Sequence, residues 1–438
     1  MTKFTTYFLI VASVSFASAG ELRNDISNDY DNHLFGLFKH FHQNPELSNQ
    51  EFNTAARLAE ELKRAGYDVT THVGGTGIVA IMKNGKGPLV MMRADMDALP
   101  IKEKSDLAYA STVMQKNEST GEINSVMHAC GHDVHMTSLI GTARRMVALK
   151  QNWSGTLMLI GQPAEETGPG AQAMIDDNLW QRFGKPDFAL AFHVEANFEA
   201  GIINVVEGPL YAGADSVEIK VHGIGAHGAS PHEGRDPIVL ASQIVLALQT
   251  LVSREISPRE PAIVTVGSFH SGTKDNIISD LALLKLTVRN TNMTTRKILL
   301  DGIKRIAINL GRAAGLPENK LPEVIVDKRF LPPTVNDRHL ATRLKNVWQT
   351  KMGLDAVTSF PPNHMGAEDF PFFTLSPKIS SVYFEVGGTP KEDFISAKNG
   401  GPAVPGHHSA LFKVEPAPAI KKGVEATVIA LLEMFLIN

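Results

Sequence analysis

The sequence predicts an α/β main domain, whose mixed and mainly parallel sheet is flanked by helices, and a smaller α+β sandwich domain inserted into it. Apolar runs typical of buried strands alternate with helical stretches over the first 205 residues. Beyond that point, apolar and polar residues alternate as in half-exposed strands. A chain of 438 residues is too long for one ordinary core. We therefore expect a discontinuous main domain, formed by residues 20–205 and 322–438, around an insertion over 206–321.

The elements of the main domain follow from the spacing of its apolar residues. An amphipathic helix is predicted over 47–66, because Phe52, Ala55 and Ala59 lie at helical spacing and Gly66 ends the run. Polar residues follow the predicted strands at their carboxyl ends, where open α/β sheets place their sites. The other predicted elements are buried strands over 88–93, 155–161 and 188–192 and a helix over 133–149.

The inserted domain shows a different pattern. Residues 216–221 alternate strictly, and two such strand and helix groups with exposed sheet faces predict a small sandwich. After it, residues 321–330 are predicted to return to the main domain as a strand. The remaining predicted elements are strands over 263–269 and 281–288 and helices over 237–253, 295–311, 338–352 and 419–435.

The N-terminus resembles a secretory signal peptide over residues 1–19. Lys3 gives it a positive start, residues 7–14 are apolar, and Ala17-Ser18-Ala19 forms a small-residue cleavage site. We expect cleavage before Gly20 and export to a periplasm or out of the cell, with an uncleaved N-terminal anchor as the alternative. The apolar run is too short for a membrane span, and we expect none after cleavage.

The charge balance argues against nucleic-acid binding. Lysine and arginine number 42 and the acidic residues 46, so the formal net charge is −4, and no basic patch stands out. Hydrophobic residues make up 43% of the chain, as in globular proteins. We therefore expect a small molecule rather than a nucleic acid as the partner.

Cys130 is the only cysteine of the chain, and His132 follows two residues later. A lone cysteine serves as a buried small residue, a nucleophile or a metal ligand. Thiolate and imidazole are good ligands for zinc-like ions, and a Cys-x-His turn holds both donors close together. The neighbouring histidine and Asp133 favour the metal-ligand interpretation.

Three further candidate ligands are Glu166, His193 and His408. Glu165 and Glu166 could not both stay ionised in a buried site without a cation or a proton, so a metal could bind one and leave the other to handle a proton. Five protein ligands exceed the three of an open zinc site, which favours two ions that share a bridge. Taken singly, such residues are more often a half-buried histidine, a solvated glutamate pair or a core cysteine.

At this point the chain resembles the M20 metallopeptidase family, in the amidohydrolase branch of hippurate hydrolases, N-acyl-amino-acid amidohydrolases and plant auxin-conjugate hydrolases. The resemblance covers almost the whole chain except the signal peptide, and several long motifs in the right order make it specific. The matching segments are 42–48, 93–100, 127–133, 162–166, 223–232, 276–278, 365–370 and 408–409.

The resemblance implies roles for the candidate residues. Glu165 becomes the general base, and Cys130 is expected to bridge two divalent ions, which zinc, manganese, cobalt or nickel could supply. The expected metal ligands are Cys130, His132, Glu166, His193 and His408. Because His193 precedes the insertion and His408 follows it, the two flanks must fold together. The doubled His407-His408 leaves the register of the last ligand open, although Ser409 and Phe412 favour His408.

The resemblance also makes the insertion a lid domain that dimerises. His227 is expected to reach the active site of the neighbouring subunit of a homodimer, where it would hydrogen-bond the developing oxyanion. Asn276 and Arg289 are expected to bind the substrate carboxylate or the oxyanion. His227 could instead be a simple loop residue between glycines.

Four acidic residues support the site in this interpretation. Asp95 and Asp97 are expected to orient a ligand histidine, with a helix-capping or turn role after the strand as the alternative. Glu368-Asp369 is expected to support the metal loop or to shape the substrate pocket. The sequence as a whole predicts a metal-dependent amidohydrolase acting on N-acyl amino acids. The alternatives are a metallo-dipeptidase or carboxypeptidase on the same scaffold, or an inactive metal-binding or ligand-binding relative.

Overall fold

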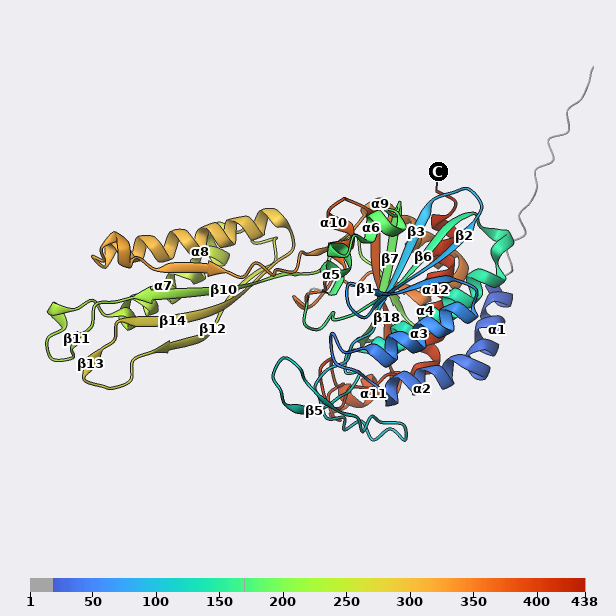
Figure 1. Ribbon diagram of the computed structural model, residues 1–438, viewed down its shortest axis with the longest axis horizontal. Helices are drawn as coiled ribbons and strands as arrows, with labels where there is room; N and C mark the ends of the chain where they lie inside the picture. The colour runs from blue at the N-terminus through green and yellow to red at the C-terminus, as the bar shows by residue number, and fades with distance from the viewer. Residues whose placement is uncertain (1–18, 169, 438) are drawn as a thin grey trace, which may run out of the picture.

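The computed structural model describes residues 19–168 and 170–437. Figure 1 shows a rounded main domain and a long, narrow second domain that projects from one side of it. The signal peptide expected over 1–19 falls, except for Ala19, outside the described residues.

The main domain is built on an eight-stranded sheet with the order β1-β2-β6-β3-β7-β18-β8-β17. The central strands β6, β3, β7 and β18 are parallel. Strands β1 and β2 pair with their neighbours in antiparallel fashion, and β8 is antiparallel to β18 but parallel to β17. The mixed, mainly parallel sheet is therefore confirmed. Its strands are β1 (Asp68–Val73), β2 (Gly77–Asn84), β3 (Leu89–Asp95), β6 (Gly155–Gln162), β7 (Phe188–Glu199), β8 (Ile203–Asn204), β17 (Val357–Thr358) and β18 (Ser380–Thr389).

Helices cover both faces of this sheet. Alternate residues of a strand point to opposite faces, so Ile78 joins one core cluster and Val79 another. The larger cluster packs helices α1 (Ala19–Asp29), α2 (Phe35–Gln43), α3 (Phe52–Arg64), α4 (His132–Ala148), α9 (Arg338–Met352) and α12 (Pro416–Met434). The smaller cluster packs α5 (Gly170–Asp176), α6 (Leu179–Phe183) and α10 (Pro371–Leu375), and α11 (Lys391–Lys398) lies outside both.

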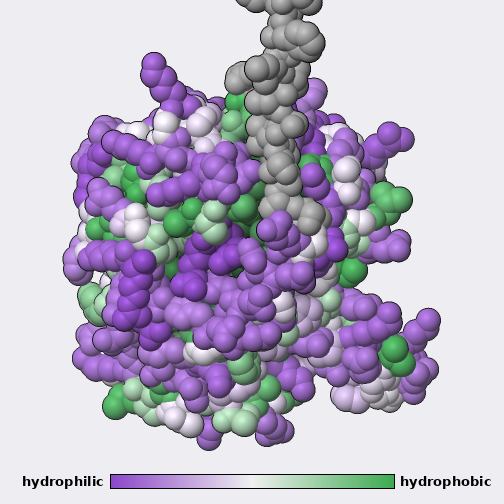
Figure 2. All heavy atoms as spheres, turned by 90° about the vertical axis from the view of Figure 1, so that its right-hand side faces the viewer, coloured by the Kyte–Doolittle hydropathy of each residue, from purple (hydrophilic) through white to green (hydrophobic). Residues whose placement is uncertain are grey.

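The visible, described part of the far end of the main domain shows no large apolar surface (Figure 2). Figure 2 views this end from the side away from the projecting domain, and its visible part is mostly hydrophilic with small, scattered hydrophobic patches. Such scattered patches are normal for a protein surface.

The projecting lid domain is a two-layer sandwich. Its four-stranded antiparallel sheet has the order β12-β14-β10-β15, and one core cluster joins this sheet to two helices. The predicted α+β insertion is therefore confirmed. Its elements are β10 (Gly213–His222), β12 (Ala262–Ser271), β14 (Leu281–Asn290), β15 (Glu323–Val326), α7 (Pro237–Thr250) and α8 (Met293–Ala313), with the short pair β11 (Ala226–His227) and β13 (Ile277–Ile278) at the tip.

The strand predicted over 321–330 does not return to the main domain, and that expectation is wrong. Residues Glu323–Val326 form β15, which pairs with β10 as an edge of the lid sheet. Its residues are alternately exposed and half-buried, as in a strand with one solvated face, which fits the lid better than the buried main sheet. The chain instead leaves and re-enters the main domain through the paired strands β9 (Gly208–Tyr211) and β16 (Thr334–Asn336).

One helical stretch among the described residues, Pro237–Glu255, is long and apolar enough to cross a membrane by length and composition. It combines α7 with a following π-helical turn. Ile244 and Leu248 are fully buried in the lid core, whereas Leu246 is 72% exposed on the outer side. A helix with one face packed on a sheet is weak grounds for a membrane span, so the described residues show no clear one.

Candidate metal centre

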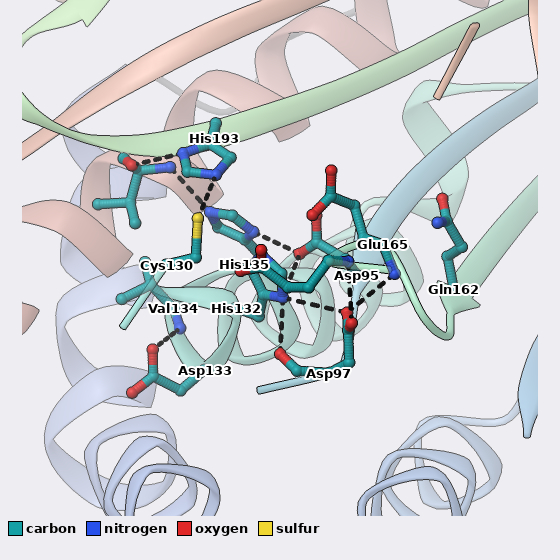
Figure 3. Close-up of polar contacts among 12 residues, drawn as sticks. Asp95, Asp97, Cys130, His132, Asp133, Val134, His135, Gln162, Glu165 and His193 are labelled. Carbon is teal, nitrogen blue, oxygen red and sulfur yellow. Dashed lines mark hydrogen bonds and ion pairs between the residues drawn. The ribbon is translucent and has the colours of Figure 1, made fainter. Parts of the chain in front are cut away.

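Cys130 and His132 reach the site from the start of α4. Gly131, between them, has a left-handed backbone with φ of 81°. A Cβ at this position would lie 2.2 Å from a methyl carbon of Val194, so only glycine fits the turn. The turn places the thiol and the first residue of the helix side by side at the carboxyl edge of the sheet (Figure 3).

The five candidate ligands come together, although they span residues 130 to 408. The Cys130 Sγ lies 3.3 Å from His193 Nε2, and the two oxygens of Glu166 lie 3.9 Å from His132 Nε2 and 3.3 Å from His408 Nε2. Two groups have donor atoms within 4.8 Å of one another: Cys130 with His132 and His193, and Cys130 with Glu166 and His408. The thiol is the donor common to both groups, as a bridging ligand must be.

The donor atoms fit a cation. His132 Nε2 and Glu166 Oε1 are buried, and neither has a hydrogen-bond partner among the described residues. Unpaired buried acceptors are costly unless an ion or water satisfies them. His193 donates from Nδ1 to the carbonyl of Val194 at 2.7 Å, which leaves its Nε2 lone pair directed at the thiol.

The electrostatics of the site also favour bound cations. Burial and the neighbouring carboxylates of Glu166 and Glu165 raise the pKa of the Cys130 thiol well above its usual range. Burial and the carboxylate of Glu368 likewise raise the pKa of Glu165. A divalent cation reverses this tendency, because it stabilises a thiolate and nearby carboxylates directly.

Asp97 supports the site mainly through its backbone carbonyl. His132 donates from Nδ1 to that oxygen at 2.7 Å, while the Asp97 carboxylate is 3.4 Å away and accepts from the amides of Glu165 and Glu166. Asp95 lies 3.8 Å from His132 but only 2.6 Å from Nδ1 of His135. The carboxylates of Asp95 and Asp97 therefore bind groups around His132, namely His135 and the amides of Glu165 and Glu166, rather than the His132 ring itself.

His135 is a supporting residue that sequence reasoning missed. The backbone amide of Val194 donates to its Nε2 at 2.8 Å, so its Nδ1 carries the proton and donates to Asp95. The ring thus ties β3 to β7 beside His193 (Figure 3). Its spacing of three residues from His132, on the same helix face, is the signal that could have revealed it.

Arg93 is a second residue that sequence reasoning did not single out. Its fully buried guanidinium contacts Asp95 at 2.6 Å, Glu368 at 2.7 Å and Asp369 at 3.2 Å. Asp369 also accepts from Gln162 and from the amide of Ala171. Glu368-Asp369 therefore joins the ends of β3 and β6, and Glu368 also lines the cavity in front of the metal cluster.

The two adjacent histidines have different surroundings. His408 lies 3.3 Å from Glu166 and has a left-handed backbone with φ of 61°, and its amide donates to the carbonyl of Ala129. His407 Nε2 lies 3.3 Å from Glu195 and accepts from the amide of Ala196. Only His408 is placed to share an ion with both Cys130 and Glu166.

A cavity of about 960 Å³ opens in front of the cluster, between the main domain and the base of the lid. Arg289 lines it from the lid side, and burial lowers the pKa of this guanidinium. Phe330 and Phe372 form an aromatic wall, with ring centroids 6.3 Å apart. The volume of this cavity is large enough for a small molecule.

His227 and Asn276 do not line this cavity. They lie together at the tip of the lid, where the amide of Gly228 donates to the carbonyl of Asn276 at 2.8 Å. Figure 1 shows β11 and β13 at the end of the lid farthest from the main domain. Within one chain, the structure therefore brings Arg289 to the metal cluster but leaves His227 and Asn276 remote from it.

Comparison with known proteins assigns the family. The profile described as Peptidase family M20/M25/M40 matches residues 91–399, which is well over half of the chain. The chain belongs to this family. As an M20 protein it is an enzyme, and its relatives are named as hydrolases and peptidases.

Three matches illustrate what this M20 hydrolase is similar to. Hippurate hydrolase of Campylobacter jejuni is 36% identical over 78% of this chain and 85% of its own length. Thermostable carboxypeptidase 2 of Saccharolobus solfataricus is 34% identical over 84% of this chain and 88% of its own. A solved structure from Bacillus subtilis, described as a dinuclear metal-binding peptidase of the M20 family, matches with a TM-score of 0.74 and 26% identity, covering 92% of this chain and 98% of that one.

Proposed function

We propose that this protein is an exported, metal-dependent amidohydrolase that cleaves the amide bond of N-acyl amino acids to a carboxylic acid and a free amino acid. The observation that carries the proposal is the convergence of one thiol, three imidazoles and one carboxylate on a cavity, with a second carboxylate beside them. Export rests on the signal-like N-terminus alone.

Two divalent ions, for example of zinc, manganese, cobalt or nickel, would be held by the five clustered donors. His132 and His193 suit one ion, Glu166 and His408 suit the other, and the Cys130 thiolate serves both. When bound, such ions polarise an amide carbonyl and bring the pKa of water near neutrality. The Bacillus subtilis structure described as dinuclear supports this stoichiometry.

Glu165 is the residue placed to move the proton. Its donor oxygen lies within 4.8 Å of His132 and Glu166, and it lines the cavity where a substrate would lie. It accepts the proton of the attacking water and delivers it to the leaving amine. Burial raises the pKa of this carboxylate, and divalent ions held by the neighbouring ligands would favour its ionised form.

Arg289 supplies a charge for the carboxylate of the amino-acid part. It is half-buried at the cavity wall and makes no ion pair within the part of the chain that the structure describes. A guanidinium can bind both oxygens of a carboxylate. This supports an N-acyl amino acid over a neutral amide.

The lid provides the missing parts of the site if the protein is a homodimer. His227 and Asn276 lie too far along the lid to serve their own chain, so a partner copy would present them. The lid has suitable surface: Val239 and Leu246 on α7 are 55% and 72% exposed, and β12 is an open sheet edge. From a partner, His227 would hydrogen-bond the oxyanion.

A substrate panel and metal analysis test the proposal. We expect purified protein to contain divalent metal, to hydrolyse N-benzoyl and N-acetyl amino acids, and to lose activity after chelation. Hydrolysis of free-amine dipeptides or of peptides only would favour the carboxypeptidase or dipeptidase alternative, which the similarity to thermostable carboxypeptidase 2 keeps in view. Metal binding without turnover of any amide would identify an inactive relative.

A further inference from the structure

The loop that carries Glu165 is held by two buried carboxylates. The backbone amides of Glu165 and Glu166 donate to Asp97 at 3.1 Å and 3.0 Å. The amide just before them, that of Ala164, donates to Glu51 at 2.9 Å. Three consecutive amides are thus fixed by side chains from two other parts of the chain.

Ala164 needs such support because of its backbone. Its φ of 50° lies in the left-handed region, which residues with a Cβ rarely adopt, and its side chain is buried. A strained conformation persists only where the surroundings determine it. The hydrogen bond from Ala164 to Glu51 is therefore part of what sets the direction in which Glu165 leaves β6.

The side chain of Glu51 does not cap the helix that it precedes. It occupies the N-cap of α3, yet its side chain makes no capping hydrogen bond. Glu46 takes that role, since it accepts from the amides of Asn53 and Thr54 at the helix start. A glutamate at an N-cap is unusual, because shorter polar side chains cap better.

Glu51 is itself anchored by two further hydrogen bonds, and in the first of them the amide of Asn49 donates to the same oxygen as Ala164, at 2.9 Å. It is fully buried, and its second oxygen accepts from the hydroxyl of Thr76, in the turn between β1 and β2, at 2.5 Å. It is also absent from the lining of the cavity. Its direct link to the reaction is therefore the hydrogen bond to Ala164 in the loop that carries Glu165.

We propose that Glu51 is a positioning residue for the reaction, which fixes the backbone of Ala164 and thereby the approach of Glu165 to the substrate. This inference rests on the proposed role of Glu165 as the base. A small misplacement of a catalytic group costs rate while leaving binding of the substrate largely unchanged. Loss of Glu51 is thus expected to lower kcat rather than raise KM.

Two substitutions at Glu51 and one at Glu46 test this. Glu51→Met keeps the length of the side chain but removes the acceptor, and we expect kcat to fall by ~10- to 100-fold with KM and metal content nearly unchanged. Glu51→Gln retains an amide oxygen for Ala164 and should restore kcat to within about threefold of the wild type. Glu46→Met, the matched control, should lower thermal stability but leave kcat unchanged below its unfolding temperature.

A second readout does not depend on activity. Hydrogen exchange of the segment 163–168 should be faster in Glu51→Met than in Glu46→Met or the wild type, because the amide of Ala164 loses its acceptor. Unchanged kcat and exchange in Glu51→Met, or an equal loss of kcat in Glu46→Met, would refute the positioning role. If the wild type hydrolyses no amide, the proposed function fails, and the exchange experiment still decides whether Glu51 holds the loop. Should Glu51→Met not fold, Thr76→Val removes only the hydroxyl that holds the second Glu51 oxygen, and it should lower kcat and speed exchange of the same segment to a smaller extent, whereas wild-type kcat and exchange in Thr76→Val would count against the positioning role.

Discussion

The carboxyl edge of the main sheet and the tip of the lid differ in how complete they are. At the sheet edge, His132 is fully buried and held by Asp97, and the donor atoms around it face one another. At the tip, His227 is exposed, and within the described part of the chain the hydrogen bond that its ring makes is one accepted from the amide of Ala229 in its own loop. The first region is pre-organised within a single chain, whereas the second leaves a polar side chain exposed at the surface.

This difference indicates a division of labour. Residues that hold ions need fixed distances, and a buried sheet edge provides them. A residue that acts on the oxyanion from a partner must instead be exposed before the partner binds. The following experiments test this division, from the largest expected effect to the smallest.

The largest effect is expected at the pre-organised edge. Glu165→Gln keeps the shape of the side chain but removes the proton acceptor, so kcat should fall by ~10³-fold or more. Metal content, measured by mass spectrometry of the purified protein, should stay at the wild-type level. Glu118→Gln, on an exposed side chain of the main domain, is the control and should have wild-type kinetics. Unchanged turnover in Glu165→Gln would discard the base assignment.

At the tip of the lid, loss of His227 should lower kcat in a way that a second subunit can restore. His227→Ala removes one oxyanion donor, and kcat should fall by ~10²- to 10³-fold. Mixing this variant with Glu165→Gln should restore about a quarter of the wild-type activity, because half of the dimers are mixed and each of these holds one complete site. Absence of recovery after subunit exchange would show that His227 does not act across a dimer.

A third test asks whether the exposed apolar side of α7 forms the interface of the proposed dimer. Leu246→Glu places a charge on the apolar lid surface and should raise the dissociation constant of the dimer by ~100-fold in sedimentation experiments. Ile123→Glu changes a similarly exposed apolar residue of the main domain, at 68% exposure, and should leave assembly unchanged. A wild-type protein that sediments as a monomer at micromolar concentration would end the dimer proposal.

The last prediction concerns His42, which contacts Asp133 beside the ligand His132 and affects the stability of the fold more than the reaction. Burial opposes a charge on His42, but hydrogen bonds to Asp133 and Glu103 outweigh it and raise the pKa of His42 to about 9. Because the folded pKa lies above the unfolded value of 6.5, this stabilisation is fully present below pH 6.5 and is lost as the pH rises through 9.

Urea unfolding of the wild type and of His42→Gln at several pH values measures this contribution. The difference in the free energy of unfolding between the two proteins should shrink by up to about 3 kcal/mol between pH 6 and pH 9.5. A difference that does not depend on pH would show that His42 stays neutral in the folded protein.

Several features could be predicted from the sequence because they are local. The apolar run of β6 and the helical spacing of α3 identify those elements, since hydrophobic periodicity reflects burial directly. The motifs at 127–133 and 162–166 identified Cys130 and Glu166, whose donor atoms the structure brings together. Local patterns also identified the lid as an insertion with its own fold.

Only the tertiary structure decided which distant groups meet. Residues 323–326 carry a pattern that suits several sheets, and pairing with β10 alone places them in the lid. Glu51 has ordinary neighbours in sequence, so its hydrogen bond with the amide of Ala164 could not be foreseen. The spacing of His135 from His132 marks the residue, but it does not reveal that the remote amide of Val194 binds its ring. The physical reason is that local periodicity records how deeply a residue is buried, whereas the direction of a hydrogen bond depends on backbone groups supplied by remote strands and turns.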